Sequence, residues 1–263
     1  MPTVAIIQAR LGSSRLPGKV LRPLLGYPML GHIVRRVGAA KKVGKVVVAT
    51  SDLPGDEPLR AFCAAEGIAC FAGSERDVLD RFYQTALLHR ADPVVRITAD
   101  CPLADPALID AVIAAGEAGG LDHIGVAAGA GAAKLTGGRF PAGLDAEFLR
   151  FSALETAWRE AVAPTDREHV TPFIWRQPER FRLGVHKSEH DYSHLRWTVD
   201  YEADFEVVAE LYAALYRPGS VFGMQDVLDF LSAHPELASR NAHHISSANH
   251  AKIWQPAESG TKE

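Results

Sequence analysis

Three cations lie within ten residues in a loop-forming stretch near the start of the sequence. They are Arg10, Arg15 and Lys19, and the same stretch carries two glycines and a proline. Glycine and proline let backbone N–H groups turn toward an anion, and the cations supply positive charge. We therefore expect a phosphate-binding loop. The alternative is a Gly/Pro connector with incidental cations.

This loop matches neither of two familiar phosphate fingerprints. Gly12 and Gly18 enclose five residues instead of the four of a Walker A loop, and Val20 stands where a Ser or Thr would hold magnesium. No GxGxxG follows the first apolar run, which excludes a dinucleotide fingerprint. The residues indicate a nucleotide-phosphate loop of a different kind.

Two carboxylates, Asp100 and Asp200, each stand at the end of an apolar run that predicts a strand. A carboxylate at a strand end, opposite a phosphate loop, is a natural Mg²⁺ ligand. Asp105, followed by Pro106, already supplies the cap of the next helix, so Asp100 is not needed there. The alternatives are a local Asx-turn for Asp100 and, for Asp200, the N-cap of a helix beginning near Glu202.

Asp145 and Glu147 alternate along a short predicted strand and would lie on one of its faces. Such a pair would bind sugar hydroxyls or assist a metal, and a solvated strand face is an equal alternative. His186, His190 and His194 recur at every fourth position. With no Cys partner and no HExxH motif, they do not favour a zinc site.

The elements that must position these residues follow from hydrophobic periodicity. Short apolar runs alternate with helical stretches, which predicts crossover units on a mainly parallel sheet in an α/β fold. Strands are expected at 4–8, 45–50, 68–71, 94–98 and 122–126, and helices at 28–40, 57–66, 78–89 and from 106 onward.

The second half of the chain follows a different pattern. We expect a Gly/Ala-rich loop at 127–138 and a strand at 145–148. Capping boxes starting at Ser152 and Thr165 predict the beginnings of two helices. Further strands are expected at 181–185 and 195–199, further helices at 202–216 and 224–233, and a frayed polar tail at 237–263.

Composition restricts the class of protein. The chain has 263 residues and a formal net charge of −4, yet its first 51 residues hold nine basic side chains and no acidic one. That asymmetry fits an anionic ligand near the amino end. The three cysteines form no CxxC pair, and no apolar run reaches the roughly 20 residues that cross a bilayer. We expect a cytoplasmic protein with neither a membrane nor a nucleic acid as partner.

Several motifs together resemble the sugar cytidylyltransferases, most of all the spore coat polysaccharide biosynthesis protein F type, with the CMP-KDO and CMP-sialic acid synthetases as more distant relatives. The opening run Ile7-Gln-Ala-Arg-Leu-Gly-Ser-Ser-Arg-Leu-Pro-Gly-Lys19 is the most specific of them. Three later motifs agree in order and spacing: Arg96-Ile-Thr-Ala-Asp-Cys-Pro102, Gly143-Leu-Asp-Ala-Glu147 with Arg167-Glu-His-Val-Thr-Pro172, and Thr198-Val-Asp200 with Asp204-Phe205.

The resemblance implies a nucleotide-diphospho-sugar transferase fold of the GT-A-like α/β/α sandwich type, with one cytidylyltransferase-like domain over 1–236. It implies a Mg²⁺-dependent enzyme that transfers CMP from CTP to a sugar or sugar acid and releases pyrophosphate. It also implies a homodimer, with 139–190 as the dimerisation or acceptor subregion. Ala142 departs from the usual Asp, and Ala99 and Cys101 depart from the KDO-enzyme pattern; both differences concern the acceptor.

The resemblance carries over to individual positions. Asp100 and Asp200 match the metal-binding aspartates, Arg10 and Lys19 are the expected catalytic cations, and the acceptor would meet Asp145, Glu147 and His169. The expected nucleotide-binding residues are Ala9, Arg10, Gly12, Ser13, Arg15, Gly18 and Lys19.

Three other functions remain open on the sequence. The fold would also serve a nucleotidylyltransferase that uses another NTP or a non-sugar acceptor such as a phosphonate. A glycosyltransferase of related fold usually carries an Asp-x-Asp motif, and none is found here. A non-catalytic RNA- or anion-binding domain would use the basic amino-terminal part, but would leave the two strand-end aspartates without a purpose.

Overall fold

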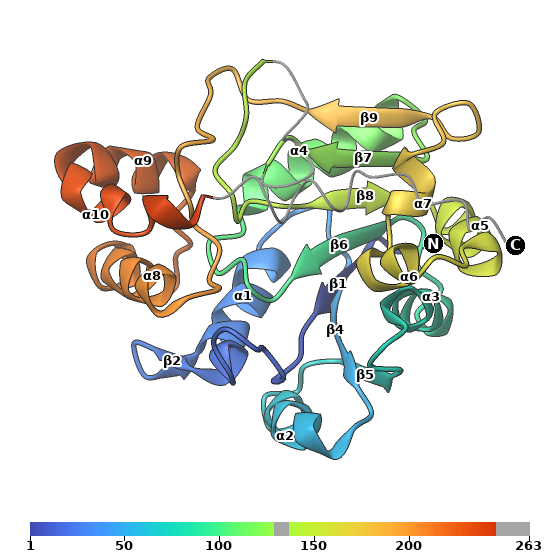
Figure 1. Cartoon of the computed structure of the whole chain (residues 1–263), viewed down its shortest axis with the longest axis horizontal. Coiled ribbons are helices and arrows are strands. Elements are labelled where there is room, and N and C mark those ends of the chain that lie inside the picture. Colours follow the sequence, from blue (N-terminus) through green and yellow to red (C-terminus); the bar gives the residue numbers. More distant parts are fainter. Residues whose placement is uncertain (129–136, 246–263) are drawn as a thin grey trace, which may run out of the picture.

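The computed structural model describes residues 1–128 and 137–245. Its centre is a seven-stranded sheet of order β5-β4-β1-β6-β8-β7-β9 (Figure 1). Every neighbouring pair is parallel except those of β8, which runs antiparallel to both β6 and β7. The strands are β1 (Val4–Gln8), β4 (Lys45–Ser51), β5 (Cys70–Gly73), β6 (Val94–Thr98), β7 (His123–Val126), β8 (Glu147–Leu149) and β9 (Leu183–His186), and a small separate hairpin pairs β2 (Pro23–Leu24) with β3 (Tyr27–Pro28).

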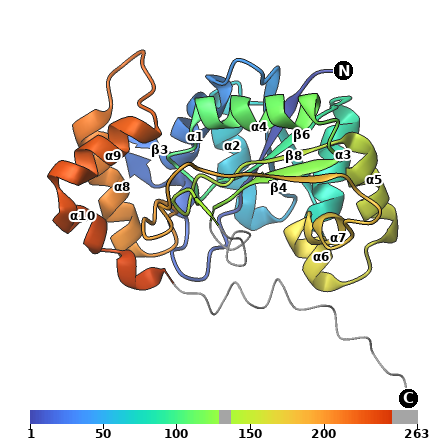
Figure 2. The ribbon, with the colours of Figure 1, turned by 90° about the horizontal axis from the view of Figure 1, so that it is seen from above.

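Helices cover both faces of the sheet, which confirms the predicted α/β/α sandwich. Ala5 and Ile7 of β1 face a core that includes residues of α1, α4 and α8, whereas Val4 and Ile6 face a second core with α3 and α5. Helices α8, α9 and α10 lie together at one side, away from α5, α6 and α7 (Figures 1 and 2). The helices are α1 (Met29–Gly38), α2 (Glu57–Ala65), α3 (Val78–Leu88), α4 (Pro106–Ala118), α5 (Phe151–Glu160), α6 (Pro164–His169), α7 (Pro172–Trp175), α8 (Glu202–Leu215), α9 (Met224–Ala233) and α10 (Pro235–Ser239).

The register of the central strands brings the two key loops together. Gln8, the last residue of β1, lies opposite Ala49 of β4 and Thr98 of β6. Because the three strands are parallel, they end at the same edge of the sheet. The phosphate-loop candidate after β1 and Asp100 after β6 therefore leave the sheet side by side.

The strand expected at 195–199 does not form a ladder, and that expectation was wrong. Within 1–128 and 137–245, Arg196 alone in this segment makes a bridge, to Ala142. The N–H of Trp197 donates to the carbonyl of Ala142, but two residues later the N–H of Val199 donates to the carbonyl of Asp100. The segment changes partner within three residues, so its backbone hydrogen bonds are made without a continuous neighbouring strand.

The two capping-box predictions were also wrong. The residues that cap α5 and α6 are Arg150 and Ala163, both in extended backbone and without a side-chain hydrogen bond to the helix. Ser152 and Thr165 lie inside the first turn instead. In α6, the proline at position 164 presets the first helical turn. By contrast, Asp105 caps α4 as predicted, accepting the N–H of Leu108 at 2.9 Å.

The tail expected to be frayed at 237–263 begins with a packed stretch. Leu237 and Asn241 are buried, so the stretch 237–245 is packed against the core and not frayed. Residues 246–263, like 129–136 of the predicted Gly/Ala-rich loop, lie outside the described residues. Within the described part of the chain, no helix has both the length and the apolar character to span a membrane.

Gly143 allows the turn before β8 to pack against the backbone of the segment that leads to Asp200. Its φ is +106°, and an added Cβ would lie 2.4 Å from the N of Thr198 and 2.5 Å from the C of Trp197. Both atoms belong to a segment that is fixed on either side, because the N–H of Trp197 donates to the carbonyl of Ala142 and the N–H of Val199 donates to the carbonyl of Asp100.

We predict that Gly143→Ala lowers the free energy of unfolding by about 1–3 kcal/mol, through overpacking and the strained φ. Gly55→Ala is the matched control, since an added Cβ there meets nothing within 4 Å. Urea unfolding of both variants measures the effect. Equal stabilities of the two variants would contradict the close approach at Gly143.

Candidate active site

The loop after β1 has a defined backbone conformation. The N–H of Ala9 extends the β1–β4 pairing, and the N–H groups of Ser13 and Gly18 both donate to the carbonyl of Leu11. Gly18 has a φ of +71°, in the left-handed region that favours glycine. The side chain of Asp56 accepts the N–H of Leu11 at 2.7 Å. These bonds hold the loop at the carboxyl edge of the sheet.

Lys19 connects this loop to both of the aspartates expected to bind metal. Its side chain is buried, and its Nζ donates to Oδ1 of Asp200 at 3.0 Å and to the carbonyl of Val199 at 2.6 Å. Oδ2 of Asp100 lies 3.7 Å from the same Nζ. One ammonium group thus lies between two carboxylates that are 100 positions apart in the sequence.

Asp200 is held by further cations and is not a helix cap. Arg15 contacts its Oδ1 at 2.7 Å and Arg196 contacts its Oδ2 at 3.0 Å, while the cap of α8 is Tyr201. Burial alone would raise the pKa of Asp200, but Lys19, Arg15 and Arg196 outweigh it and hold that pKa below its usual value. Asp200 is therefore ionised at neutral pH.

Not every residue expected in the loop joins this cluster. Arg10 and Gly12 are exposed on the loop, and the structure gives Arg10 none of the ion pairs that hold Arg15 and Lys19. The side chain of Arg10 thus remains at the surface near the carboxyl ends of the strands.

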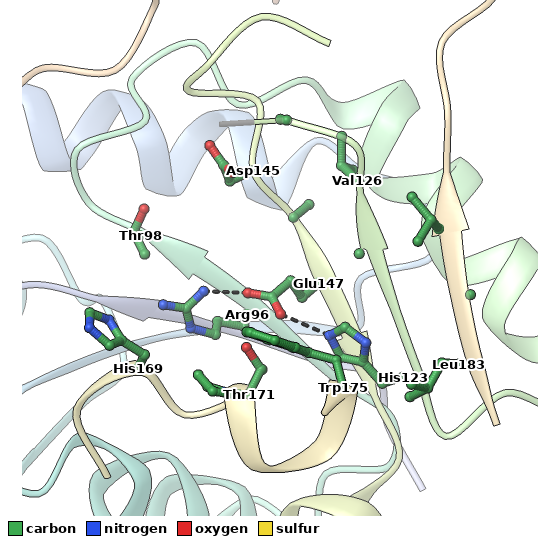
Figure 3. Close-up of a pocket in the computed structure, with 16 residues that line it drawn as sticks. Arg96, Thr98, His123, Val126, Asp145, Glu147, His169, Thr171, Trp175 and Leu183 are labelled. Atoms are coloured by element: carbon green, nitrogen blue, oxygen red, sulfur yellow. Dashed lines mark hydrogen bonds and ion pairs between the residues drawn. The ribbon is translucent and has the colours of Figure 1, made fainter. Parts of the chain in front are cut away.

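A cavity of about 420 Å³ adjoins the carboxylate pair. Thr98 lines this cavity and donates its hydroxyl to Oδ1 of Asp100 at 2.5 Å, so it belongs to both places. The three residues expected to meet the acceptor all line the cavity (Figure 3). Its lining includes the polar residues Arg96, Thr98, His123, Asp145, Glu147, His169 and Thr171 and the apolar residues Val126, Ala146, Pro172, Trp175 and Leu183.

Glu147 is balanced by two neighbours inside this cavity. Arg96 donates to its Oε1, and His123 Nε2 lies 2.8 Å from its Oε2 (Figure 3). Burial opposes ionisation, but Arg96, His123 and Thr171 lower the pKa of Glu147 to about 2. Both oxygens of Glu147 are therefore bonded to other protein groups. The guanidinium of Arg96, which Glu147 holds in place, lines the cavity.

Asp145 has a different environment although it lies only two residues away. Its Oδ2 accepts the N–H of Gly143 at 3.1 Å, and the described residues place no cation in hydrogen-bond contact with it. Burial, reinforced by Asp100 and Glu147, raises the pKa of Asp145 to about 6. Burial also lowers the pKa of His169, which is therefore neutral at neutral pH.

Several functional side chains were missed from the sequence. Arg96 stands in a motif that we quoted and Arg196 lies two residues before another, but their partners Glu147 and Asp200 could be named only from the structure. Arg96 lies on the same face of β6 as Thr98, and that alternation was the available signal. His123 and Trp175 carried no local signal.

Comparisons with known proteins point to one family. The sequence model of the family described as Cytidylyltransferase matches residues 4–225. The spore coat polysaccharide biosynthesis protein SpsF of Bacillus subtilis is 34% identical over 244 residues, which cover 89% of this chain and 95% of that protein. A 3-deoxy-manno-octulosonate cytidylyltransferase of Anaeromyxobacter dehalogenans is 43% identical over 116 residues, 43% of this chain and 47% of the relative.

A solved structure extends the similarity to the whole fold. The structure of a cytidylyltransferase from Leptospira borgpetersenii superposes with a TM-score of 0.81 at 28% identity, covering 90% of this chain and 97% of that one. The sheet, with a cationic loop and two carboxylates at its carboxyl edge, defines a protein of the nucleotide-diphospho-sugar transferase fold. The chain belongs to the cytidylyltransferase family, and within it to the sugar cytidylyltransferases that include the SpsF type.

The raised pKa of Asp145 predicts a pH dependence of stability. The folded protein binds this proton with a pKa of about 6, against an ordinary value of 3.8. Because the folded state binds the proton more tightly, its unfolding free energy falls as the pH rises from about 4 to about 6. We expect Asp145→Asn to remove this part of the fall.

Urea unfolding across this pH range, in EDTA to exclude divalent cations, measures the difference. Asp229→Asn, a change at an exposed position of α9, is the control and should keep the wild-type profile. A profile for Asp145→Asn that parallels the wild type would show that folding does not raise the pKa of Asp145.

Proposed function

We propose that this protein is a Mg²⁺-dependent cytidylyltransferase that transfers CMP from CTP to a sugar or sugar acid and releases pyrophosphate. The observation that carries the proposal is the Lys19 ammonium between Asp100 and Asp200, beside a cavity large enough for a monosaccharide. The family supports the nucleotide, and the names of the SpsF and 3-deoxy-manno-octulosonate relatives support a sugar acceptor.

In this reaction an acceptor oxygen bonds to the α-phosphorus as the bond to pyrophosphate breaks, and the acceptor releases its proton. The chain's task is to position the reactants and to stabilise negative charge. The loop of residues 9–19 would bind the triphosphate, with Arg15 and Lys19 turning from the aspartates toward the phosphates. The exposed Arg10 is free to fold onto the same phosphates, and Arg10 and Lys19 are the proposed catalytic cations.

Asp100 and Asp200 are the proposed ligands of Mg²⁺, and the donor set fits that ion. A cation already lies between the two carboxylates, in the form of the Lys19 ammonium. No group of three or more His, Cys, Asp or Glu suited to a metal occurs among the described residues. Mg²⁺ commonly takes one or two carboxylates and completes its shell with phosphate oxygens and water. When bound, it would neutralise phosphate charge.

The cavity is the proposed acceptor site. Asp145 and His169 line it with one carboxylate and one neutral imidazole, both suited to hydrogen bonds with hydroxyl groups. Glu147 would act through Arg96, whose guanidinium it holds at the cavity wall. The apolar lining around Trp175 would pack against the carbon face of a sugar.

The setting of the reaction is part of the same proposal. The relatives' names point to surface polysaccharide biosynthesis, for which a CMP-sugar is an activated donor. We further propose that the enzyme acts in the cytoplasm as a homodimer, with residues 139–190 contributing to the interface.

A screen of nucleotides against acceptors tests the function. Purified protein with Mg²⁺ and a panel of sugar acids, neutral sugars and phosphonates should release pyrophosphate faster from CTP than from ATP, GTP or UTP. Absence of pyrophosphate with every nucleotide and acceptor would overturn the proposal. A preference for another nucleotide would keep the reaction class and reject CTP.

Removing the proposed metal ligand Asp100 should abolish turnover without unfolding the protein. Asp100→Asn keeps the shape of the side chain, and Asp100 is partly exposed, so the fold should tolerate the change. We expect turnover to fall by on the order of 10³ or more, the scale of loss for a key electrostatic group in phosphoryl transfer. Asp110→Asn, at a partly exposed position on α4, is the control. Near-normal activity of Asp100→Asn would refute its assignment as a ligand.

A further inference from the structure

The side chain of Asp200 needs a support that fixes which oxygen faces the site. Asp200 stands in a connecting segment, one residue before the cap of α8, so no regular element orients it. Its Oδ1 faces Lys19 and Arg15, which belong to the phosphate-loop candidate. Its Oδ2 points the other way, to Nη2 of Arg196 at 3.0 Å. Arg196 therefore holds the oxygen that the proposed metal does not need.

Arg196 is itself fixed by a fully buried carboxylate. Its Nε and Nη2 donate to the two oxygens of Asp204 at 2.9 and 3.0 Å, the fork geometry that restricts a guanidinium most strongly. Burial opposes both charges, yet their pairing lowers the pKa of Asp204 and raises that of Arg196, so both stay ionised. Oδ2 of Asp204 also accepts the backbone N–H groups of Asp200 and Tyr201. One carboxylate thus fixes the guanidinium and the backbone of Asp200 together.

Asn241 completes this network from the far end of the described chain. The side chain is 1% exposed, and its Nδ2 donates to Oδ1 of Asp204 and to the carbonyl of Arg196, both at 2.9 Å. Nearby, the ring of His244 stacks on that of Tyr201 with 3.9 Å between the ring centroids. Arg15 lies over the same Tyr201 ring. The segment after α10 therefore contacts both the support of Asp200 and a neighbour of the phosphate loop.

A purely structural role explains this network poorly. Burying charged groups costs free energy that their pairing only partly returns, so a buried ion pair by itself is weak support for stability. Asp204 does cap α8, since the N–H of Tyr201 that it accepts is the capping-box bond of that helix. Two further contacts go beyond a cap and point to a positioning role. Asp204 also accepts the N–H of Asp200, and the guanidinium that it holds donates to Oδ2 of Asp200.

We propose that Arg196, Asp204 and Asn241 are positioning residues that hold Oδ1 of Asp200 toward Lys19 and Asp100, so that Asn241, in the segment after α10, supports the proposed metal site. This inference rests on the proposed function, since it assigns the support of a proposed Mg²⁺ ligand. Partners that orient metal ligands typically contribute 10–100-fold to metal affinity. The network should therefore act on metal affinity more than on nucleotide affinity or folding.

Mn²⁺ binding in the presence of CTP, followed by electron paramagnetic resonance, is the direct readout. Arg196→Lys keeps the charge but loses the fork, and Asn241→Ala removes the outermost support while Asp204 keeps Arg196. We expect the Mn²⁺ dissociation constant to rise about 10-fold or more in Arg196→Lys and by a smaller factor in Asn241→Ala. The dissociation constant for CTP without metal, measured by calorimetry, should change less than 3-fold.

Arg240→Ala is the matched control for the segment. Arg240 is adjacent to Asn241 but exposed, and it pairs with Glu210 at the surface. Its Mn²⁺ affinity should equal that of the wild type. In steady state, Arg196→Lys should need more Mg²⁺ for half-maximal rate and lose kcat, with little change in the KM for CTP.

Each outcome has one meaning. Wild-type protein that binds no Mn²⁺ with CTP overturns the proposed function itself. Wild-type binding that stays unchanged in Arg196→Lys and Asn241→Ala overturns the positioning role and leaves the function intact. If both variants lose their folded state in thermal unfolding, the network serves stability and the positioning role is rejected.

Discussion

The site depends on one electrostatic constraint, the presence of a cation between Asp100 and Asp200. In the structure that cation is the ammonium of Lys19, 3.0 Å from one carboxylate and 3.7 Å from the other. At such distances the Coulomb attraction within each pair is about 4–5 kcal/mol at an effective dielectric constant of 20, before the cost of removing the charges from water. Without a cation the two carboxylates would repel each other. The Lys19 ammonium is also the contact that joins three segments of the chain, namely the loop after β1, the end of β6 and the segment before α8.

Three carboxylates of the site differ in pKa because their surroundings differ. Three cations lower the pKa of Asp200, whereas burial without a cationic partner raises that of Asp145 to about 6. Glu147, balanced by Arg96 and His123, has a pKa of about 2. Contrasting environments of this kind separate the roles of similar groups. Here the charged cluster proposed to bind phosphate and metal contains Asp200, whereas the cavity contains Asp145 and the paired Glu147.

Much of the fold and of the charged cluster could be predicted from local patterns. The apolar runs of β1, β4 and β6 revealed the parallel sheet, and the strand-end rule placed Lys19 and Asp100 at one edge. Asp200 reaches the same edge from a segment that is not a strand of the sheet. The rest depends on contacts between distant residues. Arg96 and Glu147 are 51 positions apart and Asn241 and Arg196 are 45 apart, and no sequence pattern links such partners. The segment 195–199 has strand-like composition but exchanges partners too quickly to form a ladder.

Anomalous diffraction from crystals grown with Mn²⁺ and CTP would test the shared cation position most directly. We expect one strong Mn²⁺ peak coordinated by carboxylate oxygens of both Asp100 and Asp200, with the Lys19 ammonium moved onto a phosphate oxygen. A peak bound elsewhere, with Lys19 still between the two aspartates, would show that this pair is an internal ion cluster and not the metal site of the enzyme.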